Sequence, residues 1–339
     1  MLGPVRRIIR TTDAAIAAGY LSLFRERNAM LAFLFHSLFV DEAESRRDLV
    51  HPLQRTTVAQ FRRFIEYYLA RGYRFIGPSD LLAGLDPSGL YALITFDDGY
   101  FNNTRALPIL EEFKVPALFF ITTDNVLRGN CFWWDVHWRE SAARGMPDKE
   151  IVSDGRKLKL LRTEQIEVEL VRRFGAEAFR PRGNTDRPLS LDELRDFSRS
   201  PHVQLGNHTV NHAILTNYPL ADAKRQIEGA QEAIETMTGH RPVAVAYPNG
   251  AHSTDVEQLC VESGLRCGFT VQPTKTALPL DLQSPAMMRL GRFAPDGEDP
   301  MERQCRTYRS DVQLYGTLHA GYQRIKRARA RDDLKAASL

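Results

Sequence analysis

The stretch ITFDDGY, residues 94–100, ends an apolar run with two adjacent acids, Asp97 and Asp98, and a glycine. The run LYALITF (90–96) is apolar on both faces, which is typical of a buried strand in a parallel sheet. Functional groups gather at the carboxyl ends of such strands. The two acids are therefore candidate site residues. The alternative is that one of them caps a helix beginning near Asn102 and the other is solvated.

Further apolar runs alternate with helical patterns along the chain. Helices are predicted at residues 56–72, 221–239 and 253–264, where apolar residues recur at helical spacing. The other predicted strands are LAFLFHSLFV (31–40), YRFI (73–76), PALFFIT (116–122), VQLGNH (203–208), VAVAY (243–247) and CGFTV (267–271). This alternation predicts an α/β fold with a parallel sheet covered by helices, and the number of units suits a barrel.

One region, residues 122–189, breaks the alternation. It contains little strand signal, a helix-like stretch at 159–175 and the aromatic cluster FWWDVHW (132–138). We interpret it as an insertion within one domain. The predicted organisation is an N-terminal helical segment (1–29), a barrel domain (30–300, insertion at about 122–189) and a helical, basic C-terminal tail (301–339) that includes the basic stretch 321–335.

The composition sets broad limits on function. A chain of 339 residues with 43% hydrophobic residues can bury a large core, and a net charge of +3 does not indicate a nucleic-acid partner. The four cysteines form no CxxC motif, so we expect reduced thiols and a cytoplasmic protein. No apolar run is long enough to span a membrane. Weak contact of the N-terminal segment with a membrane surface stays open, as does the oligomeric state.

A second polar motif follows another predicted strand. LGNHTVNHA (205–213) carries His208 and His212 four residues apart. On one helical turn both imidazoles would share a face and could bind one ion. Two histidines and a carboxylate make either a hydrolytic zinc site or a non-haem iron site. The HxxxH pattern alone is weak evidence, but together with the paired acids it predicts a metal centre.

These motifs resemble those of the polysaccharide deacetylase family, also called the NodB homology or carbohydrate esterase family 4 group. The family motif TFDDG is present at residues 95–99, and the motif H-[ST]-x-x-H is present as His208-Thr209-Val210-Asn211-His212. The resemblance implies a distorted (β/α) barrel of the NodB type over most of the chain. It also implies metal-dependent removal of acetyl groups from acetylated carbohydrates.

The resemblance assigns roles to individual residues. Asp98, His208 and His212 would bind a divalent metal, with zinc as the first choice and cobalt, nickel, iron or manganese as alternatives. Asp97 would be the general base. Thr209, inside the histidine motif, would position a ligand or a substrate group.

A third motif matches less closely. The family's RxPY motif appears as AYPNG (246–250), in which the backbone N–H of Tyr247 would stabilise an oxyanion and Pro248 would lie at the substrate. Ala246 replaces the arginine that orients the catalytic acid in the family. RLGRF (289–293) offers Arg289 or Arg292 as a substitute, and we favour Arg289. The alternative is that both arginines are surface charges.

Members of the family usually take their general acid from a leucine-x-histidine motif late in the domain. This chain does not show that motif clearly, because His319 is the only histidine after residue 252. His36 follows the first strand, as in family members with a circularly permuted barrel, and would protonate the leaving amine. The alternative is a hydrogen-bonded core histidine. Trp133 and Trp134 are candidates for a sugar-stacking platform, with core packing as the alternative.

The leading hypothesis is a metal-dependent hydrolase that removes acetyl groups from N-acetylated amino sugars, in a polysaccharide, an oligosaccharide or a sugar precursor. O-deacetylation would use the same machinery. The alternatives are hydrolysis of a non-sugar amide or imide bond, and a catalytically silent carbohydrate-binding protein. An iron oxygenase is disfavoured, because the chain lacks the all-β core and HxD element usual for that class.

Overall fold

The computed structural model describes residues 3–52 and 54–312. His319 and the basic stretch 321–335 lie outside the described residues. Internal contacts divide the chain into two units, one of which spans Asn28–Glu298. The other contains residues 1–27 and the chain from residue 299 onward. In this second unit, helix α1 (Gly3–Leu23) packs against helix α13 (Met301–Arg309), and Arg309 forms an ion pair with Glu26 at 2.6 Å.

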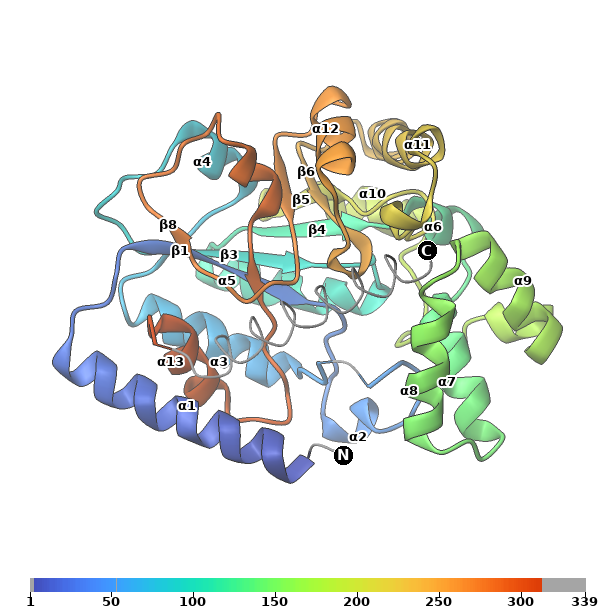
Figure 1. The fold of residues 1–339 in the computed structure, drawn as a ribbon, viewed down its shortest axis with the longest axis horizontal. Coiled ribbons are helices and arrows are strands. Elements are labelled where there is room, and N and C mark those ends of the chain that lie inside the picture. Colours follow the sequence, from blue (N-terminus) through green and yellow to red (C-terminus); the bar gives the residue numbers. More distant parts are fainter. Residues whose placement is uncertain (1–2, 53, 313–339) are drawn as a thin grey trace, which may run out of the picture. The chain divides into compact units, whose positions relative to one another are not determined.

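The larger unit is built on a mainly parallel sheet with the order β7-β6-β5-β4-β3-β1-β8 (Figure 1). In addition, β2 pairs with β3, and β9 pairs with β1. The pairing of β1 with β8 is antiparallel. The strands are β1 (Ala29–Phe35), β2 (Arg74–Phe75), β3 (Tyr91–Phe96), β4 (Ala117–Ile121), β5 (Val203–Asn207), β6 (Ala244–Ala246), β7 (Cys267–Phe269), β8 (Thr276–Ala277) and β9 (Arg292–Phe293).

Residues 290–293 nearly close this sheet into a barrel. Leu290 bridges Phe269 of β7, and two residues later β9 pairs with β1. The predicted α/β barrel with an inserted helical region is confirmed. One predicted strand, residues 31–40, is shorter than expected because its regular pairing with β3 ends at Phe35. His36 therefore starts the following loop.

Complete burial of the central strands explains their continuous apolar sequences. Every residue of β1, β3 and β4 is buried. The rings of Phe33 and Phe35 meet Phe64 of helix α3 (Val58–Leu69) edge to face. Burying one such side chain stabilises the fold by about 1.5–3 kcal/mol. This packing fixes the strand ends from which the polar side chains project.

Short helices connect and cover the strands. The α-helices are α2 (Glu42–Ser45), α3, α4 (Pro78–Ala83), α5 (Leu107–Phe113), α6 (Thr123–Arg128), α7 (Trp133–Ala143), α8 (Asp148–Leu158), α9 (Thr163–Phe174), α10 (Leu191–Ser198), α11 (Leu220–Thr238) and α12 (Thr254–Glu262). The 3-10 turns are η1 (Phe101–Ala106), η2 (Ala176–Phe179), η3 (Leu215–Asn217), η4 (Pro248–Gly250) and η5 (Pro285–Arg289).

The insertion between β4 and β5 forms a helical subassembly with its own small core. Helices α7, α8 and α9 lie together, in green, in Figure 1. Trp133, Val136, Ile166 and Leu170 pack in one buried cluster. A buried ion pair between Arg139 and Asp186, at 2.7 Å, adds to it. The insertion is thus a packed element rather than a loose loop.

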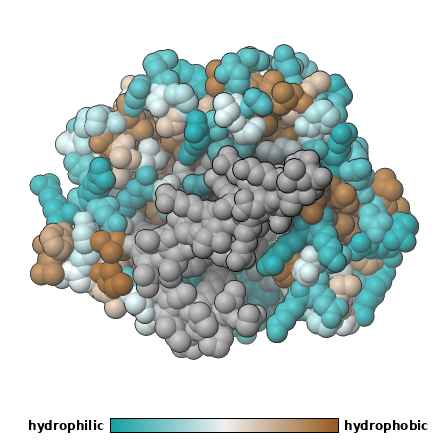
Figure 2. Space-filling model, viewed as in Figure 1, coloured by the Kyte–Doolittle hydropathy of each residue, from teal (hydrophilic) through white to brown (hydrophobic). Residues whose placement is uncertain are grey.

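The described surface is mixed in character. Hydrophilic residues make up much of it on the face in Figure 2, with smaller hydrophobic areas between them. The four cysteines are free and buried. No described helix combines the length and apolar character that a bilayer crossing requires.

A substitution at Gly206 can test how tightly β5 is packed just before the site. An added Cβ would overlap the Phe120 ring and press on Leu118. We expect Gly206→Ala to lower the free energy of unfolding by about 1–3 kcal/mol, measured by urea denaturation. Gly183→Ala is the matched control, because nothing lies within 4 Å of its added Cβ. Equal midpoints for the two variants would contradict this account.

Candidate active site

The predicted metal ligands meet at the carboxyl ends of β3 and β5. Asp98 follows β3, and His208 and His212 follow β5. The Oδ1 atom of Asp98 lies 3.3 Å from Nε2 of His208 and 3.7 Å from Nε2 of His212. The three side chains line a cavity of about 430 Å³. Parallel strand geometry therefore brings together residues more than a hundred positions apart in the sequence.

The histidine motif is a tight turn, so the expected helical turn is wrong. Thr209 and His212 have positive φ angles of 66° and 56°. The Asn207 side chain accepts a hydrogen bond from the Thr209 N–H, and the Thr209 hydroxyl accepts one from the Ala213 N–H, both at 2.8 Å. These bonds hold the strained backbone in place. Thr209 is fully buried and does not line the cavity, so in this structure it holds the histidine turn, and its predicted contact with a substrate group stays a prediction.

The side chains present fit a divalent metal. Their ligand atoms all lie within 4.8 Å of one another. Oδ1 of Asp98 is buried and has no hydrogen-bond partner among the described residues, which is costly unless a cation binds it. His208 Nδ1 donates to the Ala246 carbonyl at 2.8 Å, which turns Nε2 toward Asp98. Asp98, His208 and His212 thus form a candidate divalent metal site.

His212 is held in the protonation state that a metal ligand requires. Burial and the nearby charges of His208 and Lys159 lower its pKa well below the ordinary value. The imidazole therefore stays neutral at physiological pH, with a lone pair available for a cation.

Asp97 is held by a buried arginine. Arg292 Nη1 and Nη2 donate to Asp97 Oδ1 and Oδ2 at 2.6 and 2.9 Å. Arg292 also donates to the Thr95 hydroxyl and the Thr270 carbonyl. Burial alone would raise the pKa of Asp97, but Arg292 and then His208 outweigh burial and lower it. Asp97 is therefore a carboxylate at neutral pH, in a fixed orientation.

The preference for Arg289 as the substitute arginine is wrong. Arg289 donates to Glu257 at 2.9 Å, and its side chain is 48% exposed. Arg292 contacts Asp97 because the segment that closes the barrel carries it between β7 and β1. Arg292, and not Arg289, is thus the arginine that contacts Asp97.

The structure does not place Tyr247 and Pro248 at the cavity, so their predicted roles toward an oxyanion and a substrate stay predictions. The Tyr247 N–H donates to the Phe269 carbonyl at 3.1 Å, so it is not free for an oxyanion. The Tyr247 hydroxyl donates to the Met288 carbonyl. Both residues are buried and neither lines the cavity. Their contribution is to shape the turn that brings Asn249 to the cavity wall.

His36 lies at the cavity, directly after β1. Gln54 donates through Nε2 to the Leu34 carbonyl, so its Oε1 faces His36 Nδ1 at 2.6 Å and accepts a hydrogen bond from the Nδ1–H. The neutral ring therefore carries its proton on Nδ1 and has its lone pair on Nε2. This arrangement suits proton transfer through Nε2 in the cavity.

The two tryptophans of the insertion form part of the cavity wall. Trp133 is buried in the insertion core. Trp134 is half-buried, its ring lies 4.3 Å from the His212 ring between centroids, and its indole N–H donates to the Tyr100 hydroxyl at 2.9 Å. Tyr100 in turn donates to Asp135 at 2.6 Å. Trp134 therefore supports His212, and sugar stacking by Trp133 and Trp134 stays a prediction.

Two other titratable residues of the insertion, Asp135 and His137, are not part of the metal cluster. Asp135 accepts from Tyr100 and from the His51 N–H. Burial is the main reason that its pKa is raised to about 8. His137 lies at hydrogen-bond distance from Asp154, 2.9 Å. Asp135 thus joins the insertion to the rest of the unit, whereas His137 links α7 to α8 within the insertion.

Several cavity residues were not found from the sequence. Gln54, Arg156, Lys159 and Asn249 all line the cavity. Three of them lie in loops or the insertion, where periodicity gives no directional signal. Asn249 lay within a motif but carried no recognisable role. Its positive φ of 59° is the feature that projects it toward the cavity.

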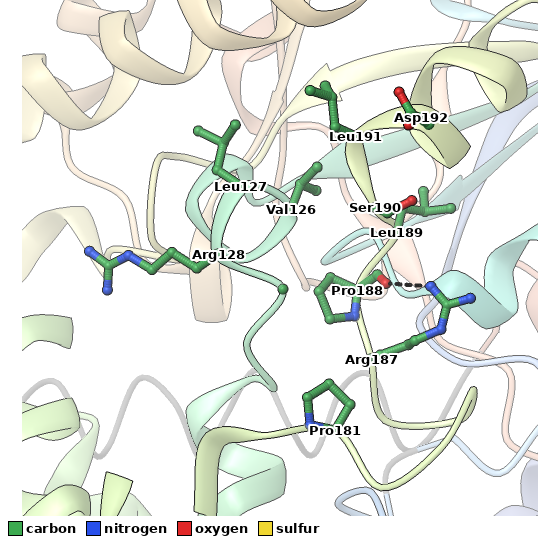
Figure 3. A pocket seen from close by; sticks show the side chains of 11 residues that line it. Val126, Leu127, Arg128, Pro181, Arg187, Pro188, Leu189, Ser190, Leu191 and Asp192 are labelled. Carbon is green, nitrogen blue, oxygen red and sulfur yellow. Dashed lines mark hydrogen bonds between the residues drawn. The ribbon is translucent and has the colours of Figure 1, made fainter. Parts of the chain in front are cut away.

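A second cavity, of about 490 Å³, lies between α6 and residues 181–192 (Figure 3). Its wall includes Leu127, Pro188 and Leu191, and its charged residues are Arg128, Arg187 and Asp192. Arg128 and Arg187 already pair with carboxylates. This cavity contains none of the Asp–His residues of the metal cluster.

Comparisons with known proteins agree with the motifs. Residues 86–268 match the family model of polysaccharide deacetylase, and the chain belongs to this family. No protein with a curated description matches the sequence.

Solved structures share the fold. The deacetylase PplD of Streptococcus pyogenes is 14% identical (TM-score 0.57, 83% of this chain and 99% of that chain). The polysaccharide deacetylase BC0361 of Bacillus cereus is 16% identical, with a TM-score of 0.56 over 83% of this chain and 69% of that chain. IcaB of Ammonifex degensii is 16% identical, with a TM-score of 0.55 over 84% of this chain and 98% of that chain. Circular permutation of the barrel stays a prediction.

The metal site can be tested by metal content. We expect Asp98→Ala and His208→Ala to lose bound zinc after dialysis, because each removes one of three ligands, whereas Asp97→Asn retains it. Elemental analysis of the purified variants measures this. His240→Ala is the control, since His240 is exposed and outside the cluster. Stoichiometric zinc in Asp98→Ala would contradict the ligand assignment.

The arginine assignment can be tested by stability and pH. Arg292→Gln leaves Asp97 buried without a counter-charge, so the free energy of unfolding should fall by about 3–5 kcal/mol. Arg292→Lys keeps a charge but loses the bidentate pair, so the pKa of Asp97 should rise.

Because a base must be deprotonated, activity in Arg292→Lys should fall off at a higher pH than in the wild type. Arg289→Gln removes only a partly exposed pair and should change stability by less than about 1 kcal/mol. Denaturation and pH–rate profiles measure both effects. A larger effect at Arg289 than at Arg292 would restore the original choice.

Proposed function

We propose that this protein is a metal-dependent hydrolase that removes the acetyl group from N-acetylated amino sugars. The observation that carries this proposal is the pairing of two adjacent carboxylates with different partners. Asp97 is paired with Arg292, while Asp98 faces His208 and His212 in the same cavity. Membership of the polysaccharide deacetylase family supports the same reaction class.

The chain's own residues supply the proton transfers. Asp97 accepts a proton from the attacking water; its oxygens keep a free lone pair beside the bonds from Arg292. A divalent metal, zinc by preference, would polarise the acetyl carbonyl and acidify water at this site. His36 acts in its doubly protonated form: it donates the Nε2 proton to the leaving nitrogen and returns to the neutral ring, which keeps its proton on Nδ1. The C–N bond breaks, a C–O bond forms, and the products are acetate and the free amine.

The cavity also bears on the alternatives. Hydrolysis of a non-sugar amide would use the same residues, and the aromatic wall of Trp133 and Trp134 does not exclude it. A silent binding protein would have no need for the buried Asp97–Arg292 pair, which costs desolvation energy. O-deacetylation differs only in the leaving atom and does not require the proton from His36 as strongly, because an alcohol leaves more readily than an amine.

Acetate release tests the proposal directly. Purified enzyme is stripped with chelator, reloaded with zinc, cobalt or nickel, and incubated with N-acetylated monosaccharides, oligosaccharides and nucleotide sugars. We expect metal-dependent acetate release by the wild type. Asp97→Asn should retain metal and lose at least about 100-fold in kcat, since general-base catalysis contributes about 10²–10⁴.

His36→Ala should lose a comparable factor while keeping its fold and metal content, which circular dichroism and elemental analysis check. An unfolded His36→Ala would support a core histidine instead. No acetate from any substrate, with one metal bound per chain, would reject the deacetylase in favour of the amide hydrolase or the binding protein.

A further inference from the structure

Two cations of the insertion face the candidate active site. Arg156 in α8 and Lys159 just after it lie three residues apart, on one face of the helix end, and both line the cavity. Lys159 Nζ donates to Asn249 Oδ1 at 3.0 Å, which ties it to the opposite wall. Desolvation of its ammonium group lowers the pKa of Lys159, and the charge of Asp98 opposes that shift.

These cations differ from the insertion's arginines in lacking a carboxylate partner. Within the described residues, neither Arg156 nor Lys159 forms an ion pair. By contrast, other arginines of the insertion are each paired with a carboxylate: Arg128 with Asp124, Arg139 with Asp186, Arg144 with Glu140, Arg172 with Glu169, and Arg173 with Asp154.

The carboxylates inside the cavity do not compensate these charges. Asp97 is already neutralised by Arg292, and Asp98 belongs to the metal cluster. With a divalent cation bound, the cavity therefore carries an excess of positive charge. A cavity wall with such an excess attracts anions and favours substrates of negative charge.

Stabilisation of the α8 helix dipole is an insufficient explanation for both cations. Basic residues near a helix C-terminus do stabilise it. Lys157 lies in the same turn, and although all three side chains are exposed, it alone does not line the cavity. It can serve the dipole from outside, whereas Arg156 and Lys159 reach the cavity.

We propose that the substrate is an acetylated amino sugar that also carries an anionic group, a phosphate or a carboxylate, bound by Arg156 and Lys159. This inference rests on the proposed function and narrows its substrate class. A guanidinium and an ammonium together suit oxyanions of either kind. The apolar part of the wall, including Trp134, Ile151 and Val271, contacts the sugar face and its acetyl methyl.

The test compares charged and neutral substrates of one sugar. Metal-loaded enzyme is given N-acetylglucosamine 1-phosphate, the corresponding 6-carboxylate, and the neutral methyl glycoside. We expect kcat/KM to be at least about tenfold higher for an anionic substrate, and this preference to shrink as salt rises. The phosphate and carboxylate arms show which anion is preferred.

Variants locate the effect. Lys159→Gln and Arg156→Gln should each reduce the anionic-to-neutral ratio of kcat/KM by about tenfold, which corresponds to about 1.4 kcal/mol. Lys157→Gln removes the same charge from the same helix outside the cavity and should leave the ratio unchanged. A ratio near one in the wild type, or equal losses in Lys157→Gln, would overturn the inference while leaving deacetylation intact.

A binding measurement separates this inference from the proposed function. Calorimetric titration of metal-loaded enzyme with glucosamine 1-phosphate and with glucosamine requires no turnover. We expect tighter binding of the phosphate, weakened about tenfold by Lys159→Gln and unchanged by Lys157→Gln. If no acetate is released from any sugar, the deacetylase proposal fails, and this titration still decides whether the cavity selects an anion. Equal affinities for both ligands would reject the anion site.

Discussion

The buried ion pair between Asp97 and Arg292 links the closure of the barrel to the chemistry of the site. Two adjacent carboxylates at one strand end would repel each other, and burial would raise their pKa values. The structure separates them by giving Asp97 a bidentate arginine and turning Asp98 toward two histidines. Arg292 reaches Asp97 only because residues 290–293 cross between β7 and β1. Barrel closure and the orientation of the carboxylate therefore depend on the same segment.

The strand ends also store backbone strain, which the rigid sheet sustains. Asp98, Thr209, His212 and Asn249 are non-glycine residues with positive φ, all at or beside the cavity. Such conformations cost about 1–3 kcal/mol each. Hydrogen bonds through Asn207 and the Thr209 hydroxyl hold the histidine turn, and the fully buried strands β3 and β4 leave little freedom to relax. These turns direct the imidazoles and carboxylates toward the cavity. A loop without such backbone angles would point the same side chains away from it.

The sequence predicted what depends on local pattern and missed what depends on contacts between distant segments. Buried strands and the paired-acid and histidine motifs carry their own signals, so the barrel and the Asp98, His208 and His212 cluster were predictable. Arg289 and Arg292 lie three residues apart with similar neighbours, and only the path of the closing segment decides which meets Asp97. Likewise, the Tyr247 N–H is unavailable because of its bond to Phe269 in a neighbouring strand. The sequence did not distinguish Lys159 from the other cations of the insertion, because only the structure shows that it lines the cavity without a carboxylate partner.

The sheet and the insertion contribute different residues to the cavity, and each part is stabilised by its own packing. The candidate metal ligands and Asp97 project from the ends of buried parallel strands, whose positions are fixed by backbone pairing and aromatic packing. Groups that line the outer cavity come from α7 and α8, which pack on a separate cluster around Trp133 and Ile166. The insertion contacts the histidine turn through Asp124 N–H to the Val210 carbonyl, and Asn211 to Glu164. A change of charge at Arg156 or Lys159 can therefore alter which substrate is held without moving the carboxylates, because the two sets of residues belong to different packed cores.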